Sequence, residues 1–339
     1  MKRLKRLRQT IQGHSRLDEA GFDFRSYGHA FEQARLLVRV FYLFIIYVLA
    51  SKSAVLWDQV QVIPYADPLW PVFWIRFFEP HTAIGTLIVV SLVIGVVGFL
   101  FPNKRLARIL VFVAYLSLAA LSNSFGKIFH LDHMPLAVSF IFILLPTAQT
   151  TTGRLSITYK HSYLMVFWAA QLTLGLFYTL SGFWKISVGI NQLLAGQINT
   201  FHPYALATLI AMRELQTQEH TILGWLIVNQ PVIGWPMHLG AVYMEFFAII
   251  AVCRPKLHQV WGIAFMAFHL GTWLFMEILF INNIFLLGLL LVLSPFAPKK
   301  IKITTFIKQL PLLGGILRIQ SSLSLNQGPI KANRPQGLP

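Results

Sequence analysis

The sequence has little charge, little acid and almost no cysteine. Only 12% of its 339 residues are charged and 56% are hydrophobic, whereas about 25% of the residues in an ordinary soluble domain are charged. This composition excludes an ordinary soluble protein. The single cysteine, Cys253, excludes a disulfide bond within the chain. We find no internal repeat, which argues against a transporter built from inverted repeats.

Acidic residues are especially scarce. The chain has 12 Asp and Glu against 28 Lys and Arg, a net charge of +16. In a soluble protein this excess would suggest binding to nucleic acid. Here the basic residues lie in short connections between apolar segments and in the two terminal segments, where they orient membrane spans. We therefore expect membrane lipid around the chain and no nucleic-acid partner.

The apolar segments predict an all-α fold, a polytopic membrane helical bundle of about eight transmembrane helices. Basic residues occur in alternate connections, so the positive-inside rule predicts that both termini are cytoplasmic. The predicted spans are 35–52, 82–101, 106–122, 134–148, 163–186, 237–253, 258–275 and 278–295.

These spans divide the chain into three parts. We expect a basic cytoplasmic N-terminal segment (1–33), a transmembrane domain (34–296) and a basic, partly disordered cytoplasmic tail (297–339). The longest outward loop, 187–236, contains two stretches with helical periodicity, which predict two short helices near the membrane surface.

One stretch, "LGLFYTLSGFWKISVG", is apolar except for a serine, a tyrosine and Lys185. If its span starts near residue 163, Lys185 lies about 33 Å along the helix, at the outer edge of the hydrocarbon. One interpretation is a lysine that reaches the lipid headgroups. Gln171, Tyr178 and Lys185 are spaced by seven and share a helix face. The flanking Gly175 and Gly182 predict that this face packs against protein.

A second cluster, "GKIFHLDHMPL", carries His130, Asp132 and His133 within four residues. Imidazole and carboxylate groups bind metals, but the cluster has no cysteine and no H-E-x-x-H pattern, so we predict no metal. A histidine that caps a helix end is the ordinary interpretation. Alternatively, His133 faces Lys185 across the outer side of the bundle, since both are predicted at outer helix ends.

A third group is predicted inside the membrane, where charged groups usually face the bundle interior in pairs. It consists of Glu245 in the sixth span, with His269, Trp273 and Glu277 on one face of the seventh. A contact between Glu245 and His269 would either lock the two helices together or take part in catalysis.

Four segments together resemble a known family. These are "FYTLSGFWKI", "GKIFHLDHMPL", "YMEFFAIIAVCRPKLHQVWGIAFMAFHL" and "EILFINNIFLLGLLL". In order and spacing they are similar to the HTTM family, the transmembrane domain related to vitamin K-dependent gamma-glutamyl carboxylase. The similarity covers roughly residues 30–295.

The resemblance implies a quinone-dependent enzyme. Lys185 matches the lysine that acts as base toward reduced vitamin K, and His133 matches a supporting histidine. Tyr178, Gly182, His130, His269 and Trp273 are then expected to bind the cofactor. An apolar surround without a carboxylate partner favours the neutral amine, which can take a proton from a hydroquinone hydroxyl.

The family chemistry uses O2 and CO2 as co-substrates. In the carboxylase the deprotonated quinone reacts with O2, the product removes a proton from the gamma carbon of a peptide glutamate, and CO2 adds. We expect reduced vitamin K or another menaquinol-type quinone as cofactor, a secreted peptide or protein as a possible substrate, and the bacterial inner (plasma) membrane as location.

The carboxylase carries a large lumenal domain after its helices, for which this sequence has no room. We therefore do not expect recognition of a propeptide by such a domain. The alternative function is a non-catalytic membrane factor that helps a secreted peptide to mature or to be exported.

Overall fold

A computed structural model describes residues 24–62, 67–126, 130–147, 156–298, 303–312 and 314. The described residues form helices and connecting turns without any β-strand, so the predicted all-α class is confirmed. Residues 1–23 and 315–339 fall outside the described part. The prediction of a disordered tail therefore lies mainly outside the described residues.

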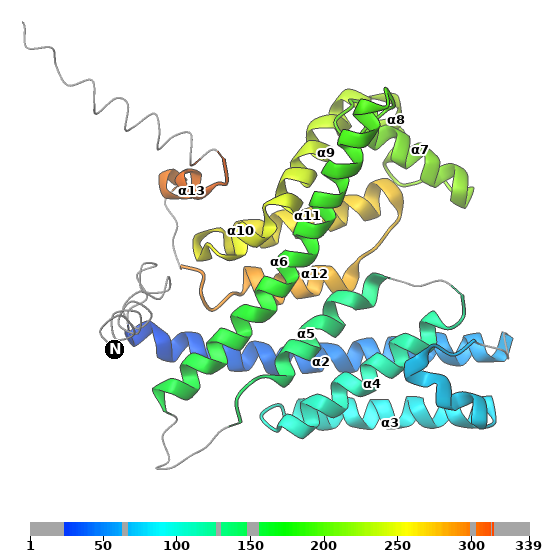
Figure 1. Cartoon of the computed structure of the whole chain (residues 1–339), viewed down its shortest axis with the longest axis vertical. Coiled ribbons are helices and arrows are strands. Elements are labelled where there is room, and N and C mark those ends of the chain that lie inside the picture. Colours follow the sequence, from blue (N-terminus) through cyan, green and yellow to red (C-terminus); the bar gives the residue numbers. More distant parts are fainter. Residues whose placement is uncertain are drawn as a thin grey trace, which may run out of the picture.

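The first four helices pack side by side at one end of the molecule (Figure 1). The long α2 is Phe24–Val62, which starts ten residues before the predicted membrane domain. It is followed by α3, Pro80–Leu100, and α4, Arg105–Asn123. The short α5, His133–Ile143, completes this layer, and it is preceded by the single turn η2, His130–Asp132.

A buried arginine holds the turn between α3 and α4 against the end of α5. Arg108 is fully buried, and its guanidinium donates hydrogen bonds to the carbonyl oxygens of Pro102, at 2.9 Å, and of Leu145. Both acceptors lie outside the regular helices, where carbonyl groups lack partners within a helix. Arg108 therefore fixes the ends of three elements.

The longest of the later helices, α6, is Ile157–Leu194 (Figure 1). Its 38 residues extend about 57 Å at 1.5 Å per residue, roughly twice the thickness of the hydrocarbon layer. The helix continues for nine residues beyond Lys185. The prediction that Lys185 lies at the outer end of its helix is therefore wrong. The thickness of the membrane limits the length of the apolar segment, whereas the helix itself can extend beyond the hydrocarbon.

Beyond α6 lies a second group of helices. The predicted loop 187–236 contains two short helices as expected, α7, Ala205–Thr217, and α8, Gly224–Asn229. The loop is shorter than predicted at its far end, because α9, Pro231–Phe246, starts at a proline that suits a first helical position. A short α10, Ala248–Val252, continues it.

The last part of the bundle is formed by α11 and α12. After the turn η3, Pro255–Leu257, α11 is His258–Met276. Next, α12, Ile281–Leu287, continues into a π-helical turn, Gly288–Val292. A short α13, Ile303–Gln309, follows.

A buried polar network joins α6 to these last elements. The Gln171 amide donates to Ser294 Oγ at 2.9 Å and to the carbonyl of Leu290 in the π-helical turn. Ser294 Oγ is also 2.8 Å from His258 Nδ1. The network pairs polar groups that are costly to bury alone.

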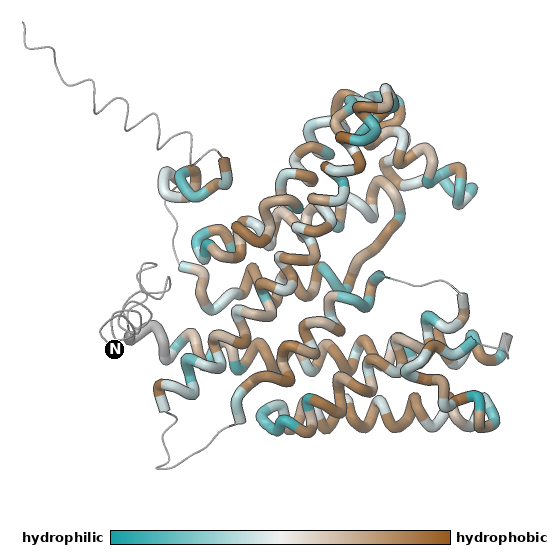
Figure 2. Tube along the Cα trace, in the orientation of Figure 1, coloured by the Kyte–Doolittle hydropathy of each residue, from teal (hydrophilic) through white to brown (hydrophobic). Residues whose placement is uncertain are grey.

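Among the described residues, five helices are long and apolar enough to cross a membrane: α2, α3, α4, α6, and η3 with α11. Figure 2 shows that α3 is hydrophobic along most of its length, with hydrophilic residues near its ends. Helices also form at the other predicted spans, but α5, α9, α10 and α12 are each shorter than any of the five. The fold is therefore that of a helical membrane protein.

Candidate functional site

Lys185 forms an ion pair with Glu245. The Lys185 Nζ atom lies 2.7 Å from Glu245 Oε1 and 2.6 Å from Oε2, which joins α6 to α9. The Glu245 side chain is 4% exposed and that of Lys185 is 34% exposed. Ser181 Oγ lies 3.4 Å from the same carboxylate. The expectation that Lys185 has no carboxylate partner is therefore wrong.

Glycine allows this pair to form. A Cβ atom at Gly182 would lie 2.8 Å from Phe246 Cα and 2.9 Å from the backbone carbon of Glu245. One at Gly175 would lie 3.0 Å from Val252 Cγ2. Because these positions carry no side chain, α6 can approach α9 closely at Gly182 and α10 closely at Gly175. The prediction that the glycine-flanked face packs against protein is confirmed.

A second pair of side chains, Tyr178 of α6 and His269 of α11, is buried. The Tyr178 hydroxyl is 2.5 Å from His269 Nε2, and the Tyr178 ring stacks on Phe265. The other ring nitrogen of His269, Nδ1, is buried and finds no hydrogen-bond partner among the residues that the structure describes. His269 thus contacts Tyr178, whereas Glu245 contacts Lys185, and the predicted contact between Glu245 and His269 is not found.

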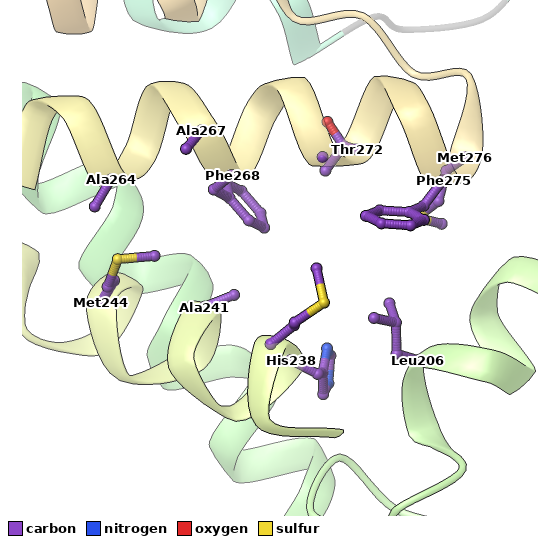
Figure 3. A pocket seen from close by; sticks show the side chains of 12 residues that line it. Leu206, His238, Ala241, Met244, Ala264, Ala267, Phe268, Thr272, Phe275 and Met276 are labelled. Carbon is purple, nitrogen blue, oxygen red and sulfur yellow. The ribbon is translucent and has the colours of Figure 1, made fainter. Parts of the chain in front are cut away.

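A cavity of about 350 Å³ lies between α9 and α11 (Figure 3). Phe268 is one of the α11 residues that line it, and the Lys185 ammonium lies 5.7 Å from the centre of the Phe268 ring. The walls are mostly apolar, formed by Leu206, Met237, His238, Ala241, Met244, Ala264, Ala267, Phe268, Gly271, Thr272, Phe275 and Met276. Small-molecule sites have this character, apolar walls with a few polar groups, and a volume of about 300–1,000 Å³.

The residues predicted to bind a cofactor do not line this cavity. Gly182 lies in the contact with α9, and Tyr178 and His269 bind each other. Trp273 is 40% exposed on another face of α11. The cavity is instead lined by His238 of α9.

His133 and His130 belong to a separate cluster. Their Nδ1 atoms lie 3.4 Å apart, and burial and the neighbouring His130 hold the pKa of His133 below its usual value. The intervening Asp132 is buried and pairs with Lys52 of α2 at 2.6 Å and with the Tyr115 hydroxyl at 3.0 Å.

No hydrogen bond or ion pair among the described residues joins this cluster to Lys185, and His133 does not line the cavity. Also among the described residues, no group of three or more His, Cys, Asp or Glu side chains is arranged to hold a metal ion.

Sequence reasoning missed His238, although a signal was present. His238 and Glu245 are seven residues apart in "HLGAVYME" and so lie on one face of a helix. His238 lies at the start of the span that was predicted from residue 237, where a histidine is easily assigned to the membrane surface.

The fold and the site define a class: a helical membrane protein with a lysine–glutamate pair beside an apolar cavity. Comparisons of the chain with models of known families, with characterised proteins and with solved structures found no match.

Proposed function

We propose that the chain is an integral membrane enzyme that uses a reduced quinone, vitamin K or another menaquinol-type quinone, with Lys185 as the base. One observation carries the proposal: the half-buried Lys185 borders an apolar cavity through Phe268 and contacts a buried proton acceptor, Glu245. The resemblance to the HTTM family supports the same assignment of the lysine.

The cavity suits a quinone ring in its chemistry. Aromatic and aliphatic side chains such as Phe268 and Met244 can pack against a flat ring. The polar side chains of the lining are few, His238 and Thr272, and they can meet ring oxygens. A bound hydroquinone would supply the reducing power, with O2 and CO2 as co-substrates if the reaction is a carboxylation.

The pair itself can accept a proton. Lys185 is more exposed than Glu245, so a ligand hydroxyl meets the lysine first. Lys185 gives one proton to the Glu245 carboxylate, whose oxygens are 2.6 and 2.7 Å away, and takes one from the hydroxyl. The hydroxyl O–H bond breaks, an O–H bond forms on Glu245, and Lys185 ends with as many protons as before. The negative charge thus moves from Glu245 to the ring oxygen, which stays beside the Lys185 ammonium, so the site holds one ion pair before and after the transfer.

The resemblance also assigns a supporting role to His133. Its pKa is below the usual value, so the imidazole is neutral at pH 7 and can accept a proton. In the proposed reaction His133 would act from its own cluster, which also contains His130 and the Lys52–Asp132 ion pair.

A second candidate is a non-catalytic membrane factor for maturation or export of a secreted peptide. The observation that favours it is the close contact of α6 with α9 at Gly182, next to the ion pair. In this case Lys185 and Glu245 only hold two helices together.

Substitution by arginine separates the two candidates. Arginine keeps the positive charge but does not give up a proton. If Lys185 is the base, Lys185→Arg and Lys185→Ala should both slow oxidation of menadiol by the purified protein by about 100-fold or more, measured as O2 consumption. Lys160→Arg, at the other end of α6, is the matched control and should keep full activity. Mass spectrometry of lipids extracted from the wild-type protein should detect a quinone.

An active Lys185→Arg variant would exclude the base role, whereas a wild-type protein that neither oxidises menadiol nor carries a quinone would favour the non-catalytic factor. Thermal unfolding in detergent must show that each variant is folded, so that a loss of activity cannot be attributed to a loss of structure.

A further inference from the structure

His238 is the one imidazole among the residues that line the cavity. Figure 3 shows its ring on the α9 side, with Thr272 on the opposite, α11 side. The described structure assigns no hydrogen bond to the His238 ring, unlike the rings of His258 and His269, which are paired within the core. Its two nitrogens are therefore available to a ligand.

The position of His238 along α9 is related to that of the ion pair. His238, Ala241 and Glu245 follow a spacing of three and four residues, so they lie on one face of the helix. Ala241 also lines the cavity. Along the axis, His238 and Glu245 are about 10.5 Å apart at 1.5 Å per residue. His238 thus lines the cavity itself, whereas the Lys185–Glu245 pair lies outside the lining, with the Lys185 ammonium 5.7 Å from the centre of the Phe268 ring that does line it.

We propose that His238 is the second hydrogen-bonding group of the site, and that it binds the ring oxygen opposite to the one that faces Lys185. This inference rests on the proposed function and names its substrate class: a ring with oxygens on opposite carbons, rather than a phenol with one hydroxyl. Such a ring, with a hydrogen bond of about 2.8 Å at each end, is comparable in length with the rise of α9 from His238 to Glu245, the residue that holds Lys185.

The chemistry of imidazole suits both states of such a ligand. A neutral imidazole has one nitrogen that donates and one that accepts. It can accept from the hydroxyl of a hydroquinone and donate to the carbonyl of the oxidised ring. His238 therefore holds the ring in place before and after a reaction at the Lys185 end.

The test compares two ligands that differ in one hydroxyl. Binding of menadiol and of 2-methyl-1-naphthol to the full chain in lipid nanodiscs is measured by calorimetry without oxygen. The wild-type protein should bind menadiol about three- to tenfold more tightly, the effect of one hydrogen bond. His238→Leu should bind both equally. His238→Gln, which keeps hydrogen-bonding groups, should recover part of the preference. His220→Leu, at an exposed loop position, should behave as wild type.

The outcomes separate the two proposals. If wild type binds menadiol and both His238 variants keep the full preference, the role of His238 is overturned and the proposed function stands. If wild type binds neither ligand, the proposed function fails and the role of His238 fails with it. Because His238→Gln is close in polarity to histidine, it provides the test even if His238→Leu does not fold.

Discussion

At the scale of single residues, the main feature is a charged pair in an apolar bundle. Removing one member of a buried ion pair leaves an uncompensated charge, which costs about 3–5 kcal/mol, while replacing both members with apolar residues is often tolerated. Lys185 and Glu245 contact each other through both carboxylate oxygens. A double substitution that keeps the fold but abolishes menadiol oxidation would therefore show that the pair is needed for activity and not for stability.

Gly182 sets the distance between the two charges. We expect Gly182→Ala to destabilise the protein by about 1–3 kcal/mol, as overpacking does, because its Cβ would lie 2.8 Å from Phe246 Cα. The variant should also lose activity, since α6 must move away from Glu245. Gly240→Ala is the control, because a Cβ there meets nothing within 4 Å. Thermal unfolding in detergent measures the stability of both variants. Equal stability of Gly182→Ala and Gly240→Ala would contradict the close contact.

At the scale of secondary-structure elements, the connection between α7 and α8 is held by one carboxylate. Glu214 Oε1 accepts hydrogen bonds from the backbone N–H of Thr221 at 3.0 Å and from its hydroxyl at 2.8 Å. These bonds, the backbone one first, hold the pKa of Glu214 below its usual value of 4.5. Leu223 N–H then donates to the carbonyl of Leu274, which ties α8 to α11.

This carboxylate predicts a pH dependence. Because the pKa of Glu214 is lower in the folded state, its contribution is fully present above pH 4.5 and is lost as the pH falls through the lowered value. We expect hydrogen exchange of α7 and α8, corrected for intrinsic rates, to rise on acidification, and Glu214→Gln to show the raised exchange already at pH 7. The neighbouring Glu219→Gln, at an exposed position, should not. Equal exchange in the two variants would contradict this role.

The elements also show what the sequence can and cannot predict. Apolar periodicity predicts that helices form, because it depends on residues close together in the chain. It also predicts that Gln171, Tyr178 and Lys185 share a face. It does not predict that Glu245 pairs with Lys185 instead of His269, because several polar groups are predicted at the same depth in the membrane. Which side chains meet between two helices depends on the rotation of each helix about its axis and on close contacts such as that at Gly182.

At the scale of the whole molecule, the orientation in the membrane remains a prediction from charge. We propose that both termini are cytoplasmic and that residues 187–236 face outward. Cysteines at Gln197 and at Lys104, both exposed, in a Cys253→Ser background should react with a membrane-impermeant maleimide from opposite sides. Labelling of both from outside would overturn this orientation.

The distance between Lys185 and Glu245 along the chain has a consequence for biosynthesis. The two residues are 60 positions apart, so a ribosome that adds 5–20 residues per second completes Glu245 about 3–12 s after Lys185. During this interval Glu245, the partner of the lysine in the folded protein, has not yet been synthesised, and a charge at membrane depth is costly. We expect α6 to leave the insertion channel only after α9 has been made. Crosslinking of α6 to the channel should persist in chains stalled before residue 245 and disappear in chains stalled well after it; early release would contradict this order.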